Sequence, residues 1–376
     1  MLITRIHQLK TIIILILFSF ISRFIPQGKH WVICERGTDA RDNGWHFYNY
    51  MKKNHPEINV YYIIDKKSVD YIKVKEDSVH YGSLKNYWLV VRAEKIISTH
   101  VATSVPYLGG KVKKLFPKLE DKFYFLQHGV ISNYIDFLHR NNMKTNLFIC
   151  GAKPESDFIK AKFGHEDGVV QYTGLARYDS LHNVRTKKQI LIMPTWRTYI
   201  HTREEFLESV YFTQWQNLLE NKKVYELLNK SGFELIFYPH YEVQKYLDCF
   251  HTEYSCIKIA SFNDYDVQIL LKESMLMITD YSSVFFDFGY MKKPIIYFHF
   301  DANEFYEKHH RRGYFDHETH GFGKVCATCE EVVDEIKKCL DNNFVLEELY
   351  SERLETFFPL HDENNCQRIY EKIVGQ

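Results

Sequence analysis

The sequence predicts two α/β domains, each built on a parallel β-sheet flanked by helices. Short runs of β-branched and aromatic residues recur and are separated by segments of helical length, which is the pattern of such a sheet. The pattern stops in the basic, polar stretch 182–189 and then starts again. The chain has 376 residues, of which 45% are hydrophobic, and this is enough for two domains of ordinary size.

We therefore expect three parts. A short apolar helix in segment 1–26 comes first, a doubly wound domain at 27–184 follows, and a second doubly wound domain occupies 185–376. We expect the last helix to pack back on the first domain. The 48 basic and 48 acidic side chains give no net charge, so nucleic acid is not an expected partner. Eight scattered cysteines favour a reducing compartment.

The apolar run at 11–22 lies between the basic residues Lys10 and Arg23. It falls short of the roughly 20 apolar residues that cross a bilayer, and Pro26 stops the helix. No small-x-small cleavage site follows, so removal as a signal peptide is not expected. We favour a monotopic membrane contact, and the alternative is a helix packed on the body of the protein. A second basic stretch that suits anionic headgroups consists of Lys111, Lys113, Lys114 and Lys118.

Ten apolar runs are predicted to be strands. Those of the first domain are 30–35, 60–65, 94–99, 122–127, 146–151 and 169–174. Those of the second domain are 189–194, 233–238, 274–279 and 294–299. Ligands bind outside the carboxyl ends of the strands in an open parallel sheet. We therefore expect the site in a central cleft between two facing domains.

Small and hydroxylic residues follow many of these strands, together with three histidines and one arginine. Helix N-caps explain the small and hydroxylic residues. They explain the three histidines and the arginine less well. These four residues are His100, His128, His240 and Arg197.

The clearest single unit is the βαβ segment 274–300, in which a Thr-Asp-Tyr-Ser-Ser turn leads into a very apolar helix. Ser282 and Ser283 begin that helix, where free N–H groups and the helix dipole favour a phosphate. A serine N-cap without a ligand explains the same two residues. Asp287, one turn further, suits either a buried partner or a ribose hydroxyl.

Five motifs occur in order along the chain, and together they resemble the CDP-glycerol glycerophosphotransferase family of teichoic-acid and capsule polymerases and primases. The motifs are QHG (127–129), MPTWR (193–197), YPH (238–240), TDYSSVFFDFGYMKKPIIYF (279–298) and RRGYF (311–315). The resemblance implies a GT-B-like architecture of two Rossmann-like domains, with the donor nucleotide bound mainly by the C-terminal one.

The resemblance also implies an activity. It implies transfer of glycerol phosphate, or a related polyol phosphate, from a CDP-alcohol to a hydroxyl of a teichoic-acid or capsular acceptor, with release of CMP. CDP-glycerol or CDP-ribitol is the implied donor and no tightly bound cofactor is implied. The implied place is the cytoplasmic face of the bacterial membrane, where the protein is peripheral or monotopic and the acceptor is a lipid-linked or polymeric glycan.

The residues suit this chemistry. Forming a phosphodiester needs a base for the acceptor proton and cations or dipoles on the pyrophosphate oxygens. His128 matches the family's catalytic His-Gly position and is the expected base, and His240 matches the second family histidine and is assigned to the donor phosphates. The expected donor-binding residues are Gly129, Thr195, Arg197, Pro239, Thr279, Asp280, Ser282, Ser283, Asp287, Arg311 and Arg312.

Two positions depart from the commoner family pattern. Gln127 stands before the first His-Gly where many members carry tryptophan, and Val130-Ile131 replaces a Thr-Pro. Tyr238 stands where many members place a basic or polar residue.

The sequence does not predict a metal site. A single Cys-x-x-Cys at 326–329 has no second pair, whereas a structural zinc needs four ligands. The histidines of HETH (317–320) and His309-His310 lack the spacing of helical zinc proteases. Dependence on a divalent metal and the oligomeric state stay open.

Two other function classes fit the same fold. One is a GT-B glycosyltransferase that uses a nucleotide sugar, since fold does not decide function. The other is a non-catalytic nucleotide-binding subunit of a polysaccharide assembly complex.

Overall fold

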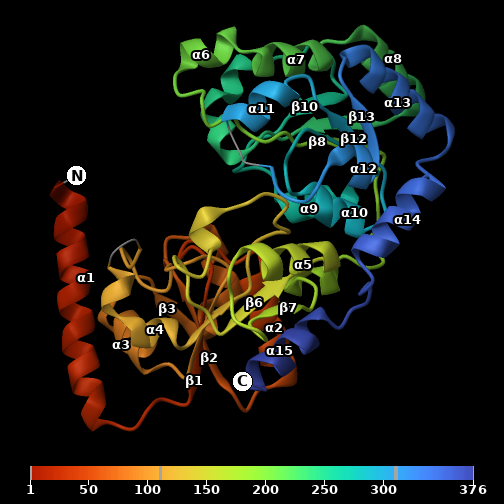
Figure 1. Cartoon of the computed structure of the whole chain (residues 1–376). Coiled ribbons are helices and arrows are strands. Elements are labelled where there is room, and N and C mark those ends of the chain that lie inside the picture. Colours follow the sequence, from red (N-terminus) through yellow and green to blue (C-terminus); the bar gives the residue numbers. More distant parts are fainter. Residues whose placement is uncertain (1, 110–111, 309–311, 376) are drawn as a thin grey trace. The chain divides into compact units, whose positions relative to one another are not determined.

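The computed structural model describes residues 2–109, 112–308 and 312–375, and Figure 1 shows its helices and strands. The chain forms two compact units. Unit 1 comprises Met1–Val130, Ile135–Ser180 and Asp362–Gln376, and unit 2 comprises Ile131–Tyr134 and Leu181–His361.

Unit 1 contains a parallel sheet of seven strands in the order β3-β2-β1-β4-β5-β6-β7. Its strands are β1 (His30–Cys34), β2 (Asn59–Ile64), β3 (Ser78–His80), β4 (Lys95–Ser98), β5 (Phe123–Phe125), β6 (Leu147–Cys150) and β7 (Val170–Tyr172). In the register of this sheet Val32 lies opposite Tyr61 on one side and Ile96 on the other. The strand order reverses between β1 and β4, which is the switch point where such sheets bind ligands.

The α-helices of unit 1 are α1 (Leu2–Ile21), α2 (Asn43–Asn54), α3 (Leu84–Arg92), α4 (Pro117–Glu120), α5 (Lys153–Lys162) and α15 (Asn365–Val374). Its 3-10 helices are η1 (Ser22–Phe24), η2 (Val69–Asp77), η3 (Lys113–Leu115), η4 (Asp136–Leu138) and η5 (Ala176–Ser180). The last helix, α15, packs on η5 and α2. Asp179 holds its first turn by accepting hydrogen bonds from the N–H groups of Asn365 and Cys366.

Unit 2 contains a parallel sheet of six strands in the order β10-β9-β8-β11-β12-β13. Its strands are β8 (Gln189–Ile192), β9 (Glu234–Phe237), β10 (Ile257–Ile259), β11 (Leu276–Thr279), β12 (Ile295–Phe298) and β13 (Gly323–Cys326). The order again reverses beside the first strand, between β8 and β11. Both sheets are parallel with helices between the strands, so the predicted α/β class is confirmed.

The α-helices of unit 2 are α6 (Arg203–Glu208), α7 (Val210–Leu219), α8 (Lys222–Ser231), α9 (Val267–Glu273), α10 (Phe285–Tyr290), α11 (Ala302–Lys308), α12 (His317–His320), α13 (Cys329–Asp341) and α14 (Glu348–Phe357), and a 3-10 helix, η6 (Tyr241–Cys249), follows β9. Trp215 of α7 is fully buried at the centre of this core. It contacts Phe237 and Phe298 on the sheet at ring-centroid distances of 6.3 and 5.3 Å.

Three strands, β3, β10 and β13, were not predicted from the sequence. Each lies at an edge of its sheet, and each has three or four residues. An edge strand is half exposed, so its sequence has no long apolar run by which to recognise it.

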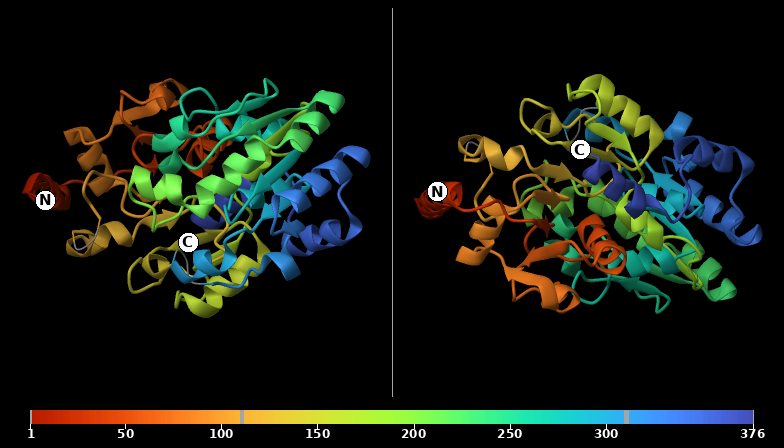
Figure 2. Two further views of the ribbon diagram at one scale, coloured as in Figure 1. Left: turned by 90° about the horizontal axis from the view of Figure 1, so that it is seen from above. Right: turned by 90° about the horizontal axis from the view of Figure 1, so that it is seen from below.

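Helix α1 packs along α3 at the edge of unit 1 (Figures 1 and 2). Thr11 is buried there and hydrogen-bonds the Tyr87 hydroxyl and the Pro106 carbonyl, each at 3.0 Å. Phe18 meets Trp88 edge-on at 5.3 Å. The alternative to the favoured membrane contact, a helix packed on the body of the protein, is therefore present along one of its faces.

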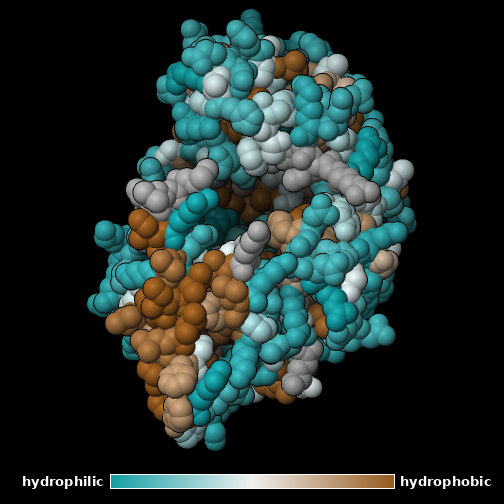
Figure 3. Space-filling view, turned by 60° about the vertical axis from the view of Figure 1, so that its left-hand side comes forward, coloured by the Kyte–Doolittle hydropathy of each residue, from teal (hydrophilic) through white to brown (hydrophobic). Residues whose placement is uncertain are grey.

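The opposite face of α1 is exposed and apolar, and Figure 3 shows apolar side chains gathered along it. Its members, each more than half exposed, are Ile6, Leu9, Ile13, Ile16, Leu17 and Phe20. The sequence-based argument that this segment is too short to span a bilayer is wrong. Helical residues Thr4–Phe24 form a stretch of 21 residues that is long and apolar enough for a span. The argument failed because the helix begins well before the apolar run.

Replacing Trp215 with alanine is expected to lower the free energy of unfolding of unit 2 by about 3–5 kcal/mol, because a large side chain leaves a cavity in a packed core. Urea unfolding followed by circular dichroism measures the change. Leu207→Ala, at a position that is 44% exposed in the neighbouring α6, is the control and should change the free energy by no more than about 0.5 kcal/mol. Equal effects of the two substitutions would contradict this account of the core.

Candidate active site

His128 follows β5 in a turn that buried side chains hold in place. Gln127, the residue before it, is buried and has a φ of 44°, in the left-handed region that residues other than glycine rarely adopt. Its side-chain amide donates to Oε1 of Glu155 at 3.1 Å, and its carbonyl accepts a hydrogen bond from Nδ2 of Asn43 at 2.9 Å. These bonds stabilise a strained turn, after which the His128 side chain is exposed.

Arg177 ties this turn to the start of α2. Its Nη1 donates to the carbonyl oxygen of His128 at 2.8 Å and to Oδ1 of Asp42 at 2.7 Å. Although His128 keeps exposed surface, protein atoms surround it closely, and this desolvation, followed by the charges of Arg177 and Arg36, lowers its pKa to about 4. Its imidazole is therefore neutral near pH 7, the state that can accept a proton.

The loop from β1 to α2 is organised by the buried carboxylate of Glu35. This carboxylate accepts hydrogen bonds from the N–H groups of Arg41, Asp42 and Trp45 at 3.1, 3.0 and 2.8 Å. Burial, with a smaller contribution from the charge of Asp42, raises the pKa of Glu35 to about 7. Because three N–H groups converge on one carboxyl group, the loop has a fixed course beside the switch point.

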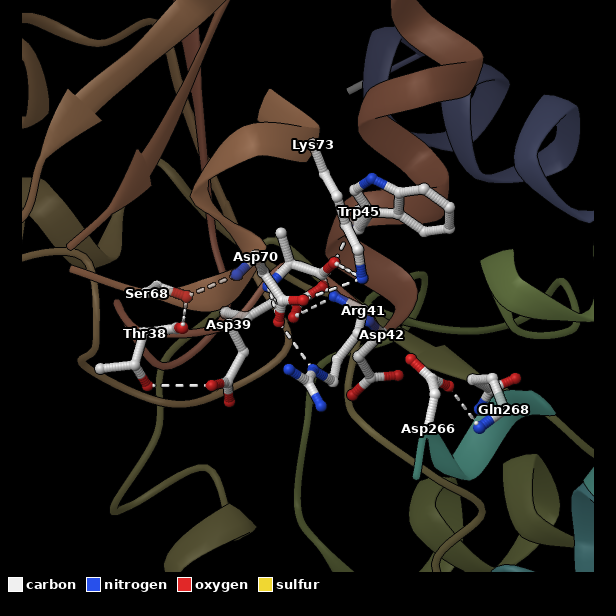
Figure 4. A network of polar contacts seen from close by, with 12 residues as sticks. Thr38, Asp39, Arg41, Asp42, Trp45, Ser68, Asp70, Lys73, Asp266 and Gln268 are labelled. Atoms are coloured by element: carbon white, nitrogen blue, oxygen red, sulfur yellow. Dashed lines mark hydrogen bonds and ion pairs between the residues drawn. The ribbon is translucent and has the colours of Figure 1, made fainter. Parts of the chain in front are cut away.

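A second buried carboxylate, Asp70, holds the outer part of the same loop (Figure 4). Oδ2 of Asp70 lies 2.6 Å from Nε of Arg41, and Oδ1 lies 2.9 Å from Nζ of Lys73. Desolvation raises the pKa of Asp70, but the hydrogen bonds from the two cations outweigh it, so the pKa is lowered. Lys73 also lies over the Trp45 ring at 5.3 Å, which connects η2 to α2.

In unit 2, Asp280 joins the two loops at the switch point between β8 and β11. Its buried Oδ1 accepts hydrogen bonds from the N–H groups of Thr195 and Tyr281, both at 2.7 Å. Its Oδ2 accepts one from Nη1 of Arg197 at 2.9 Å. Desolvation raises the pKa of Asp280, and Arg197 opposes it most. Asp280 thus connects the MPTWR and TDYSS segments rather than facing a ligand.

The structure corrects the role expected of Arg197. Its side chain has no exposed surface, and besides Asp280 it binds Asp301 through Nε at 2.7 Å and Nη2 at 3.0 Å. The rings of Tyr211 and Phe305 lie 4.9 and 5.0 Å from its Cζ. Because its planar group is taken up by two buried carboxylates, Arg197 supports the loop and does not reach donor phosphates.

Thr279 is likewise turned inward, because its buried hydroxyl donates to the carbonyl of Met193 at 2.7 Å. Ser282 is 8% exposed and Ser283 is exposed. Within the described part of the chain, neither serine hydroxyl bonds another residue. Asp287 is buried in the first turn of α10. The two serines remain predicted phosphate ligands. Thr279 instead connects the end of β11 to the residue that follows β8.

His240 follows β9 and lies parallel to Trp196, with ring centroids 6.0 Å apart. Its Nδ1 accepts a hydrogen bond from the N–H of Glu242 at 3.2 Å. A neutral His240 therefore carries its proton on Nε2, and such a donor suits an anionic oxygen. Pro239 is buried and Thr195 is half-buried beside it in unit 2.

The remaining predicted residues are dispersed. Gly129 is buried after His128. Arg312 is exposed, with its guanidinium 4.1 Å from the centre of the Tyr306 ring. Arg311 lies outside the described residues, as do His309, His310 and Lys111. Gly313 is required in RRGYF because a Cβ there would lie 2.0 Å from the carbonyl oxygen of Ser132.

Four residues that shape these sites were not assigned from the sequence. Glu155 lies in α5, Arg177 in η5 and Asp301 in the loop after β12, and nothing in the sequence distinguishes them. His100 did carry a signal, because it follows β4, and its ring lies parallel to that of His128.

Metal ligands do not cluster in the described residues, where no group of three or more His, Cys, Asp or Glu side chains is arranged to hold an ion. In the Cys-x-x-Cys segment, Cys326 is buried in β13 and Cys329 begins α13.

Comparison with known proteins decides the family. The family of CDP-glycerol:poly(glycerophosphate) glycerophosphotransferases matches residues 17–375. The chain belongs to this family.

Two proteins of Bacillus subtilis (strain 168) are similar to this chain. The minor teichoic acid biosynthesis protein GgaB is 31% identical over 363 residues, covering 92% of this chain and 39% of that protein. The teichoic acid poly(glycerol phosphate) polymerase is 26% identical over 391 residues, covering 95% of this chain and 50% of that protein. This glycerophosphotransferase-family chain thus spans half or less of the length of these two relatives.

Solved structures confirm the predicted fold class, a GT-B-like pair of Rossmann-like units. The wall teichoic acid polymerase TagF matches with a TM-score of 0.71 at 18% identity, covering 99% of this chain and 98% of that chain. A UDP-N-acetylglucosamine 2-epimerase matches with a TM-score of 0.58 at 13% identity, covering 93% and 96%. These likenesses concern the fold.

Replacing Arg197 with methionine is expected to destabilise unit 2 by about 3–5 kcal/mol, because Asp280 and Asp301 are left as unpaired buried charges. Arg203→Met is a matched control, since Arg203 pairs with Asp248 on the surface, where water screens the pair and its loss should change the free energy of unfolding far less. Urea unfolding measures both. A fully stable Arg197→Met protein with weakened CDP-glycerol binding would instead favour direct phosphate contact.

Proposed function

We propose that this protein transfers glycerol phosphate, or a related polyol phosphate such as ribitol phosphate, from a CDP-alcohol to a hydroxyl of a teichoic-acid or capsular glycan. Family membership and similarity to teichoic acid glycerol-phosphate and ribitol-phosphate polymerases support the reaction class. The single observation that carries it here is the placement of His128 and His240, each after a strand near the switch point of its own sheet.

The chemistry assigns each histidine a role. The acceptor hydroxyl oxygen bonds to the β-phosphorus of the donor while the bond from that phosphorus to the oxygen bridging to the α-phosphate breaks, and CMP leaves. The acceptor proton passes to a ring nitrogen of His128, which is neutral because its pKa is lowered. His240 donates from Nε2 to a donor phosphate oxygen, where the charge of the leaving CMP develops.

The remaining donor contacts come from unit 2. The hydroxyls of Ser282 and Ser283 and the exposed Arg312 supply hydrogen-bond donors and positive charge to the pyrophosphate. Asp287 is 2% exposed and interacts within the protein, which favours its expected role with a buried partner over one with a ribose hydroxyl. Asp280 and Arg197 support the loops that carry these groups, by the contacts described above.

His128→Ala is expected to lower CMP release from CDP-glycerol or CDP-ribitol by about 10²–10⁴-fold, the usual contribution of a general base. The test incubates the purified protein with each CDP-alcohol and with a UDP-sugar, in the presence of a membrane extract as acceptor, and measures CMP and UDP. His251→Ala is the matched control, because His251 is an exposed histidine of unit 2 that pairs with Glu220.

The same assay separates the alternatives. Since His128 acts as the neutral base, the rate of CMP release should fall only as the pH drops through the lowered pKa of His128, near 4 and well below 6.5. UDP release without CMP would identify a nucleotide-sugar glycosyltransferase. No turnover of any donor, together with no thermal stabilisation by CDP-alcohols, would favour the non-catalytic subunit.

We further propose that α1 places the protein on the cytoplasmic face of the membrane as a monotopic helix. One face of α1 is engaged with α3 through Thr11 and Phe18, whereas its opposite face is apolar and exposed. A helix that spans the bilayer cannot keep this contact with a surface helix along its middle. An interfacial helix buries its apolar face in the acyl boundary and keeps the contact.

Replacing Ile13 and Leu17 together with lysine is expected to weaken binding to vesicles of phosphatidylglycerol and phosphatidylethanolamine at least about 10-fold, because two apolar side chains leave the bilayer. Vesicle flotation measures the bound fraction. Val345→Lys, at a position in unit 2 that is 65% exposed, should leave it unchanged. Resistance of the wild-type protein to extraction at alkaline pH would contradict the monotopic placement and favour a span.

A further inference from the structure

His100 is a half-buried histidine that has no role in the proposed reaction. It follows β4, which pairs with β1 on one side and β5 on the other. The residues that follow these three strands therefore lie at one edge of the sheet. The ring of His100 lies over that of His128, with centroids 4.9 Å apart and planes inclined by 16°. Two parallel imidazoles thus occupy the carboxyl ends of adjacent strands.

The hydrogen bonds of His100 fix its tautomer. Nε of Arg36 lies 3.2 Å from Nε2 of His100, and a guanidinium can only donate, so this ring nitrogen accepts. In the neutral ring the proton is then on Nδ1, which lies 2.8 Å from the Thr99 hydroxyl and donates to it. Both nitrogens are engaged, so the ring has one orientation.

A second proton on His100 is unfavourable. It would place an N–H at Nε2 directly against the Nε–H of Arg36. Desolvation, with smaller contributions from His128 and Arg36, lowers the pKa of His100 to about 3. The ring therefore stays neutral over the whole range in which the enzyme is expected to work.

The charged side chains that act on His128 are two arginines, Arg177 and Arg36. Arg36 pairs with Asp39 at 3.6 Å, and Arg177 pairs with Asp42 at 2.7 Å. Glu35 is committed to backbone N–H groups, and among the described residues the ring contact of His128 is with His100. Within the described residues, the interaction that orients the His128 ring itself is therefore the stack on His100.

We propose that His100 is the positioning residue for His128, holding the plane of the catalytic imidazole so that its nitrogen faces the acceptor hydroxyl. This inference rests on the proposed role of His128 as base. The stack supplies orientation without a hydrogen bond, so it leaves both nitrogens of His128 to the substrate. A base held in this way is aligned before the acceptor arrives, which is where much of the rate of a positioned reaction originates.

The test compares His100→Ala, which removes the ring, with His100→Phe, which keeps a flat ring but no nitrogen. His100→Ala should lower kcat about 10- to 100-fold, the cost of a misplaced reacting group. The KM for CDP-glycerol should stay within about twofold, since His100 lies in unit 1 and the donor contacts lie in unit 2. His100→Phe should recover a large part of kcat, and His251→Ala is again the control.

Titration of His128 by NMR gives a readout that needs no turnover. The His128 ring signal is assigned by its loss in His128→Ala. In His100→Ala its midpoint should move upward, toward 6.5, because one face of the ring becomes solvated, and the acid limb of the kcat profile should move with it. In Arg36→Met it should also move upward, because a positive charge is removed.

The outcomes are distinct. Unchanged kcat and unchanged titration in His100→Ala would overturn the proposal. Equal losses in His100→Ala and His100→Phe, parallel to a fall in Tm and with no shift of the titration, would also overturn it and leave only a structural role. Full activity of His128→Ala would overturn the base assignment itself, and the titration would still show whether the two rings are coupled.

Discussion

Buried carboxylates accepting backbone N–H groups hold the loops on which both candidate sites depend. Glu35 gathers three N–H groups after β1, and Asp280 gathers two after β11 together with a guanidinium. Glu155 binds the N–H groups of Gly151 and Ala152 and the amide of Gln127. Each carboxylate would be costly if unpaired, so the loop that satisfies it has little freedom. A rigid scaffold of this kind is what keeps catalytic side chains in place.

The two units use their cations differently. In unit 1, desolvation lowers the pKa of His128 most, and the charges of Arg177 and Arg36 lower it further. In unit 2, Arg197 is enclosed by Asp280 and Asp301 and stabilises the strand ends from inside. This difference suits the proposed reaction. A base must stay neutral and accessible, whereas a binding site for two phosphates needs loops whose N–H and hydroxyl donors do not move.

The apolar helix α1 has two different faces. One packs on the protein and includes a buried hydroxyl, Thr11, and the other is apolar and exposed. The sequence shows an apolar run but not which side of it is covered, because the contacts that cover it come from Tyr87, Trp88 and Pro106, far along the chain. In the proposed monotopic placement, a unit held at the membrane surface would remain next to a lipid-linked acceptor.

The sequence by itself determined the α/β class, ten of the strands and the family, because buried parallel strands are continuous apolar runs and the motifs lie at their ends. It also placed His128 and His240 at strand ends. Only the tertiary structure decided which polar residues are open to a ligand. Arg197 and Thr279 look like ligand residues in sequence, yet their partners, Asp301 and Met193, lie in the loops that follow β12 and β8. The proposed role of His100 could not be predicted from the sequence either. It depends on β4 lying between β1 and β5, and this strand order is set by long-range pairing that no local pattern encodes.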